Sequence, residues 1–114
     1  MNLNTLKGQV ELILSTHEYT RNSDIALMIE IWKRFYPTLI KTGTTGEQGI
    51  WLKDLYDLPR EDNIKRMRAS FQNDKTDPKY LPTDWAVAKQ RGINAQVWRS
   101  HLGYAPNSPN PQTV

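Results

Sequence analysis

The stretch 60–74 gathers the side chains of this sequence that are best suited to contact a polyanion. Four cations fall within nine residues and two amides follow them: Arg60, Lys65, Arg66, Arg68, Gln72 and Asn73. Lysine and arginine neutralise phosphates and reach guanine edges, and asparagine and glutamine pair with adenine edges. This combination predicts contact with the backbone and the bases of a nucleic acid.

Helical geometry places these side chains relative to a core. At about 100° per residue, Ile64, Met67 and Phe71 share one narrow stripe that must be buried. The cations and amides then occupy the opposite half, with Arg68 on one flank of the stripe. Ala69 on the same half would permit close approach to a ligand. We therefore expect an exposed cationic helix that three apolar anchors hold to the body.

The charge of the whole chain is only mildly basic, but it is unevenly distributed. Nine of the 15 lysines and arginines lie in residues 60–101, against five of the 12 aspartates and glutamates. Such asymmetry is typical of a domain with one face toward a polyanion. Lys89, Arg91 and Arg99 are candidates to extend the backbone contacts of the 60–74 helix.

The segment before the basic helix suggests how it is presented. A short amphipathic helix at 50–58, a break around Pro59 and an exposed cationic helix follow the order of a helix-turn-helix motif, although proline stands where many such turns have glycine. The same residues are also compatible with a helix that is cationic only because it faces water. Contact with a protein partner is a third possibility.

The chain length and composition bound the architecture. A chain of 114 residues without cysteine is the size of one domain and excludes disulfides and thiolate metal sites. We expect a single helical domain at 1–104 and a flexible tail at 105–114, where three prolines fall in ten residues. The amino-terminal residues lack the pattern of a secretory signal, and no apolar window reaches the length of a membrane span, so we expect a cytoplasmic protein.

Periodicity predicts an all-α fold, a compact bundle of five or six helices with a helix-turn-helix-like corner. The predicted helices span about 5–16, 24–36, 50–58, 60–74, 84–91 and 94–104. Residues 38–49 are expected to form a loop or at most a short hairpin. The helix at 24–36 is expected to be central, because Ile25, Met28, Ile29, Trp32 and Phe35 form a broad apolar stripe, widened by Leu27 and Ile31.

Aromatic residues divide between the core and candidate contact positions. Trp32 is expected in the core, whereas Trp51, Trp85, Trp98 and Tyr80 are candidates for partial exposure. An exposed tryptophan beside the basic helix would favour a single-stranded nucleic acid or a protein partner.

No constellation of catalytic residues stands out. His17 and His101 lack neighbouring ligands, and the glycines of 43–49 lack the lysine and flanking strand of a phosphate loop. We expect no enzymatic activity, no cofactor and no metal site.

Four segments of the sequence form a further pattern: 20-TRNSDIALMIEIW-32, 64-IKRMRASFQND-74, 79-KYLPTD-84 and 89-KQR-91. Together they resemble a group of small phage-encoded helical proteins that are loosely regarded as helix-turn-helix-like nucleic-acid binders. The resemblance spans about residues 15–104 and implies a phage source and DNA contact by Arg66, Arg68 and Gln72. The sequence departs from the pattern at Ala69, where the group has a second consecutive arginine.

These observations lead to two hypotheses of function. The first is a non-enzymatic phage DNA-binding protein with a regulatory or accessory role, for example in transcription. The second is a protein-binding inhibitor or adaptor that acts on a host or phage complex such as a bacterial defence system. Recognition of two DNA half-sites would need a dimer, for which the sequence identifies no interface.

Overall fold

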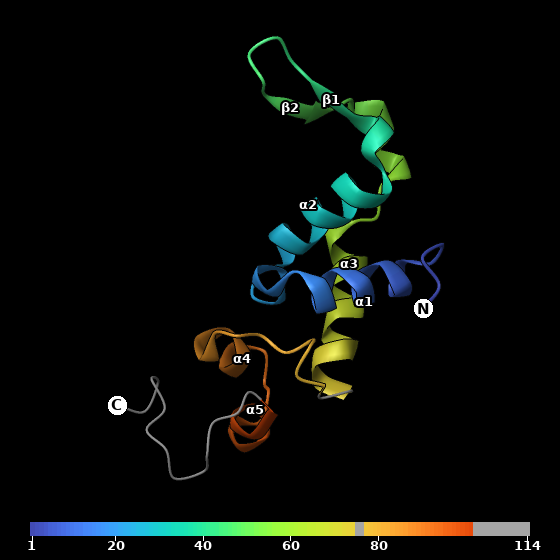
Figure 1. Cartoon of the computed structure of the whole chain (residues 1–114). Coiled ribbons are helices and arrows are strands. Elements are labelled where there is room, and N and C mark those ends of the chain that lie inside the picture. The colour runs from blue at the N-terminus through green and yellow to red at the C-terminus, as the bar shows by residue number, and fades with distance from the viewer. Residues whose placement is uncertain (75–76, 102–114) are drawn as a thin grey trace.

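The computed structural model describes residues 1–74 and 77–101, and its centre is formed by three helices that pack against one another. These are α1 (Leu6–Thr16), α2 (Asp24–Phe35) and α3 (Glu61–Ala69) (Figure 1). At the start of α1 and of α2, a side chain accepts a hydrogen bond from the first turn of the helix. Thr5 Oγ1 accepts from the Gly8 amide at 3.2 Å, and Ser23 Oγ accepts from the Ala26 amide at 3.2 Å. The described part of the chain is mostly helical, as predicted.

The main core lies where these three helices meet. Its buried members are Val10, Ile13, Leu14, Leu27, Ile31, Ile64, Phe71 and Tyr80. The predicted apolar stripe of the 60–74 helix faces this core: Ile64 and Phe71 are buried, and Met67 is partly buried against them.

The predicted orientation of α2 is wrong in part. Leu27 and Ile31, which were expected only to widen its stripe, are fully buried, whereas Ile25 and Ile29 are 48% and 44% exposed. The sequence of α2 is apolar around most of its circumference, so periodicity could not decide which side meets α1 and α3. Two isoleucines of α2 are therefore left on the surface.

Residues 37–58 project from the end of α2 as an arm, at the top of Figure 1. The arm contains the 3₁₀ helix η2 (Pro37–Leu39), the antiparallel strands β1 (Ile40–Thr42) and β2 (Gln48–Ile50), and the 3₁₀ helix η3 (Leu52–Asp57). Gly46, with φ of 88°, provides the left-handed residue of the hairpin turn. At the base of the arm, Trp32 Nε1 donates to the Pro59 carbonyl at 3.0 Å.

The arm agrees with one expectation and corrects another. The region 38–49 forms a short hairpin, the most regular structure expected there, whereas the α-helix expected at 50–58 is a 3₁₀ helix without a buried side chain. The partners of α3 are instead α1 and α2. The first helix of the expected helix-turn-helix-like corner is thus not an α-helix packed on α3.

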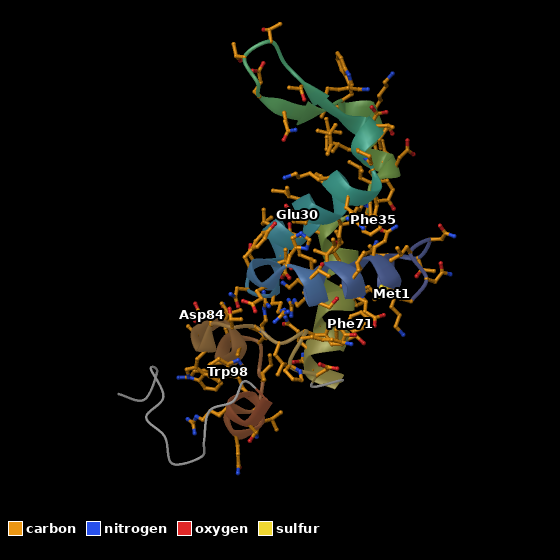
Figure 2. The ribbon with its side chains drawn as sticks, viewed as in Figure 1. Met1, Glu30, Phe35, Phe71, Asp84 and Trp98 are labelled. Atoms are coloured by element: carbon orange, nitrogen blue, oxygen red, sulfur yellow. The ribbon has the colours of Figure 1, made fainter. Side chains whose placement is uncertain are left out.

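A second, smaller hydrophobic cluster forms around α4 (Trp85–Gln90) and α5 (Ala95–His101). It consists of Leu81, Ala88, Ile93 and Trp98, with Trp85 packed against it. Gly92, with φ of 76°, follows α4 and reverses the chain toward α5. Figure 2 shows Trp98 in this cluster and Phe71 in the main core, in separate parts of the molecule.

The two clusters meet along a polar seam. The 3₁₀ helix η1 (Glu18–Arg21) and the following Asn22 form one side of it, and residues 78–91 form the other. The predicted tail at 105–114 lies outside the described residues. Among the described helices, none has the length and apolar character needed to cross a bilayer.

Candidate functional site

The predicted binding residue Arg68 is part of a buried ion pair. It is only 4% exposed, and its Nε and Nη2 donate to Asp24 Oδ1 and Oδ2, both at 2.9 Å. Burial disfavours the charged Asp24 carboxylate, but the hydrogen bonds and charge of Arg68, joined by the charge of Arg91, outweigh burial and lower the pKa of Asp24. This bidentate pair fastens α3 to the first residue of α2.

Two further predicted binding residues belong to the same interior network. Gln72 is fully buried, and its Nε2 donates to the carbonyls of Arg21 at 3.0 Å and Tyr80 at 2.8 Å. Arg91 Nη1 donates to the Arg21 carbonyl at 2.6 Å and to Gln72 Oε1 at 3.0 Å. These bonds hold the seam between the two hydrophobic clusters.

The expectation that Arg68 and Gln72 face outward is therefore wrong, for two physical reasons. Arg68 contacts Asp24, and Gln72 contacts the Tyr80 carbonyl. The positions of these partners depend on contacts between residues that are distant in the sequence. In addition, α3 does not continue regularly, because η4 (Ser70–Asp74) is a π-helical turn. The wider turn changes the angular spacing of about 100° per residue from which Gln72 was expected in the exposed half of the helix.

Tyr80, a candidate for exposure, is also internal. It is 4% exposed, and its ring packs against that of Phe71 with the centroids 4.9 Å apart. Its hydroxyl donates a hydrogen bond to Glu11 Oε2 at 2.7 Å. Burial, together with this carboxylate, raises the pKa of Tyr80. Trp98 is buried as well, with Nε1 bonded to the Pro82 carbonyl at 2.7 Å.

Three other predicted binding residues, Arg60, Lys89 and Arg99, make none of these hydrogen bonds. Arg60 is exposed near the base of the arm, and Lys89 is exposed on α4. Arg99 is half-buried, and its Nε has no hydrogen-bond partner among the described residues. These three residues are not brought together into one binding site with the rest.

Lys65, Arg66 and Asn73 remain exposed and share one hollow with the buried pair. This basic hollow, of about 630 Å³, is lined by Asp24, Asp62, Lys65, Arg66, Arg68, Ala69, Asn73, Gln90 and Arg91. It lies where α3 and the end of α4 face each other across the start of α2. The structure thus keeps part of the predicted cationic surface, but as a concave site and not as a convex ridge.

The second notable surface is apolar and was not predicted from the sequence. Leu52 is 79% exposed and Tyr56 is 81% exposed, both on η3. They line a hollow of about 550 Å³ together with Met28, Trp32, Leu55, Leu58 and Pro59 and the charged residues Lys53, Arg60 and Glu61.

A smaller hollow of about 270 Å³ continues this apolar surface. It is lined by Ile29, Trp32, Lys33, Ile40, Gln48, Gly49 and Ile50. Because Trp32 lines both hollows, they are neighbours on one surface between α2 and the arm. We call the exposed part of it, formed by Ile29, Leu52, Leu55 and Tyr56, the arm surface.

The sequence contained a weak signal for the arm surface. In 50-IWLKDLYDL-58, apolar residues occupy more positions than one face of a short helix can bury. Leu58 is buried, but Trp51, Leu52 and Tyr56 are not. This excess of apolar residues, next to a glycine- and threonine-rich segment, indicated that some of these side chains would remain outside the core.

No group of three or more histidine, cysteine, aspartate or glutamate side chains among the described residues is arranged to hold a metal ion. His17 lies 3.9 Å from Glu30, measured from Nε2 to Oε2, and the side chain of His101 lies outside the described part.

Comparison with known proteins gives no match. No protein-family model, no curated protein and no solved structure is significantly similar to this chain. Its function must therefore be argued from the geometry of the two surfaces.

Proposed function

We propose that this protein is a non-enzymatic protein-binding adaptor or inhibitor that docks on its partner through the arm surface. The observation that supports this most directly is the exposure of Leu52 and Tyr56, at 79% and 81%, around an apolar hollow. Contiguous apolar surface that remains in water is characteristic of protein interaction sites. Burying this apolar surface against a partner would contribute favourable hydrophobic free energy to binding.

The composition of the arm surface fits a protein partner. Large aromatic and aliphatic side chains form most of the lining of the larger hollow, together with Lys53, Arg60 and Glu61, which carry charges of both signs. Protein interfaces commonly combine such apolar side chains with a smaller number of charged ones. A partner segment with one or two apolar anchors, such as an amphipathic helix, would fit the hollow beside Trp32.

The surroundings of α3 give less support to a role as a DNA-reading helix. Arg68 and Gln72, two of the residues chosen for that role, are engaged inside the molecule. The exposed cations of α3 are accompanied by Glu61 and Asp62 in its first turn. The exposed cations of α3 are therefore a weaker candidate interface than the arm surface.

The test compares two double variants that remove the same residue types. Leu52→Ser with Tyr56→Ser alters the arm surface, and Leu3→Ser with Tyr19→Ser alters exposed side chains outside the arm. Each form is used to capture proteins from nuclease-treated bacterial extract. Any protein held by the wild type and the control but not by the arm variant is purified and titrated.

We expect the arm variant to bind that protein at least about tenfold more weakly, since each truncated interface anchor costs roughly 1–2 kcal/mol. Sedimentation velocity is measured in parallel, because a dimer lost only in the arm variant would identify a second copy as the partner. The proposal fails if wild type is monomeric and no protein distinguishes it from the arm variant.

A further inference from the structure

We propose that the basic hollow between α3 and α4 is a binding site for a phosphate group. The hollow is separate from the arm surface, with which it shares no lining residue. Its volume of about 630 Å³ lies within the roughly 300–1,000 Å³ that small-ligand sites occupy.

The charges that line the hollow favour an anion. Four cations, Lys65, Arg66, Arg68 and Arg91, face two carboxylates, Asp24 and Asp62. The Asp24 carboxylate is already engaged by Arg68, and it also lies 3.7 Å from Arg91, measured from Nη2 to Oδ1. Two guanidinium groups therefore share one carboxylate, which leaves the interior of the site with an excess positive charge.

The excess positive charge in the hollow affects the pKa of Arg91. Its burial and the neighbouring charge of Arg68 lower the pKa of Arg91, and Asp24 compensates only in part. A second anion near Arg91 would stabilise its charged form and reduce the repulsion from Arg68. The half-buried position of Arg91 at the wall of an open hollow makes it accessible to such an anion.

The remaining lining residues match a phosphate better than a single carboxylate. Lys65 and Arg66 are exposed cations on α3, and Asn73 and Gln90 bring side-chain amides that can donate hydrogen bonds. The small side chain of Ala69 leaves room between them. A phosphate offers several acceptor oxygens to donors that approach from α3 and α4 at once.

The same chemistry is supplied by a nucleic-acid backbone or by a free phosphate compound. A backbone would use the hollow for one phosphate, with Lys89 on α4 as an exposed neighbour in sequence of Gln90 and Arg91. A nucleotide would fill more of the hollow. The experiment therefore uses three probes: inorganic phosphate, ADP and a DNA duplex of about 20 base pairs.

Binding is followed by amide chemical shifts and by affinity measured at several salt concentrations. Lys65→Gln with Arg66→Gln removes two exposed cations of the hollow, and Lys33→Gln with Arg34→Gln is a matched control in the last turn of α2. Circular dichroism verifies that both variants keep the wild-type helix content.

We expect at least one probe to shift amides of α3 and of residues 90–91, and to bind the hollow variant about tenfold more weakly than wild type or control. If the probe is DNA, the slope of log affinity against log salt should fall in magnitude by about two. Preference for the duplex identifies a backbone phosphate as the ligand, and preference for phosphate or ADP identifies a free phosphate compound. The site is rejected if no probe binds, or if both variants weaken binding equally.

Discussion

Arg68 and Asp24 are separated by 44 residues in the sequence, yet their side chains form a bidentate ion pair. Arg21, Asp24, Arg68, Gln72 and Tyr80 lie in the segments that carry the resemblance to phage proteins, and all five are engaged in interior contacts. In this chain, these residues are explained by the fold.

At the residue scale, we predict that Arg68→Ala lowers the free energy of unfolding by about 3 kcal/mol or more. The substitution leaves the Asp24 carboxylate in its largely buried place, with Arg91 at 3.7 Å as its remaining cationic partner. Urea denaturation at neutral pH measures the change.

The matched control for Arg68 is its exposed neighbour. Arg66→Ala lies on the same helix, and substitution there should change stability by no more than about 0.5 kcal/mol. Equal effects of the two substitutions would contradict the buried ion pair.

At the scale of elements, the α4–α5 unit has its own small core and is joined to α1–α3 mainly by hydrogen bonds. The Asn22 side chain contributes three of them, donating to Thr83 Oγ1 at 2.8 Å and accepting from the amides of Thr83 and Asp84 at 2.9 and 3.2 Å. Polar seams of this kind open more easily than apolar cores. The described part of the chain thus contains one main body and one attached unit.

We predict that Asn22→Ala loosens this attachment without unfolding the main body. Losing these bonds should reduce the local stability of α4 by roughly 1–2 kcal/mol, which corresponds to about tenfold faster amide exchange. Hydrogen exchange followed by mass spectrometry should show the change in residues 83–91 but not in α1. Asn63→Ala, an exposed change on α3, serves as the control, and an effect spread evenly over all helices would argue against a separable unit.

At the scale of the whole molecule, the arm makes the structure elongated. The principal extents are 53 × 32 × 20 Å, and the Cα radius of gyration is 16.3 Å. A compact domain of this length would have a radius of gyration of roughly 13 Å. The extension exposes the arm surface and places it away from the α4–α5 unit (Figure 1).

We predict that the hairpin can be removed without loss of the body. Ile40 and Ile50 are paired across the strands, so a Gly-Gly linker in place of 40–50 can join Leu39 to Trp51. The hairpin side chains are exposed or only half-buried, so stability should change by about 1 kcal/mol or less. Small-angle scattering should show a smaller radius of gyration and thermal melting an intact transition. Loss of that transition would mean that the hairpin belongs to the cooperative core.

The sequence by itself determined where most helices lie and which apolar residues anchor the 60–74 segment. Apolar spacing is local, so Ile64 and Phe71 could be assigned to the core without knowing their partners. Tertiary structure decided which charges are neutralised and which apolar residues stay in water. Asp24 meets Arg68, and Leu52 meets no core, because of how distant segments pack. That packing depends on contacts that local periodicity does not encode.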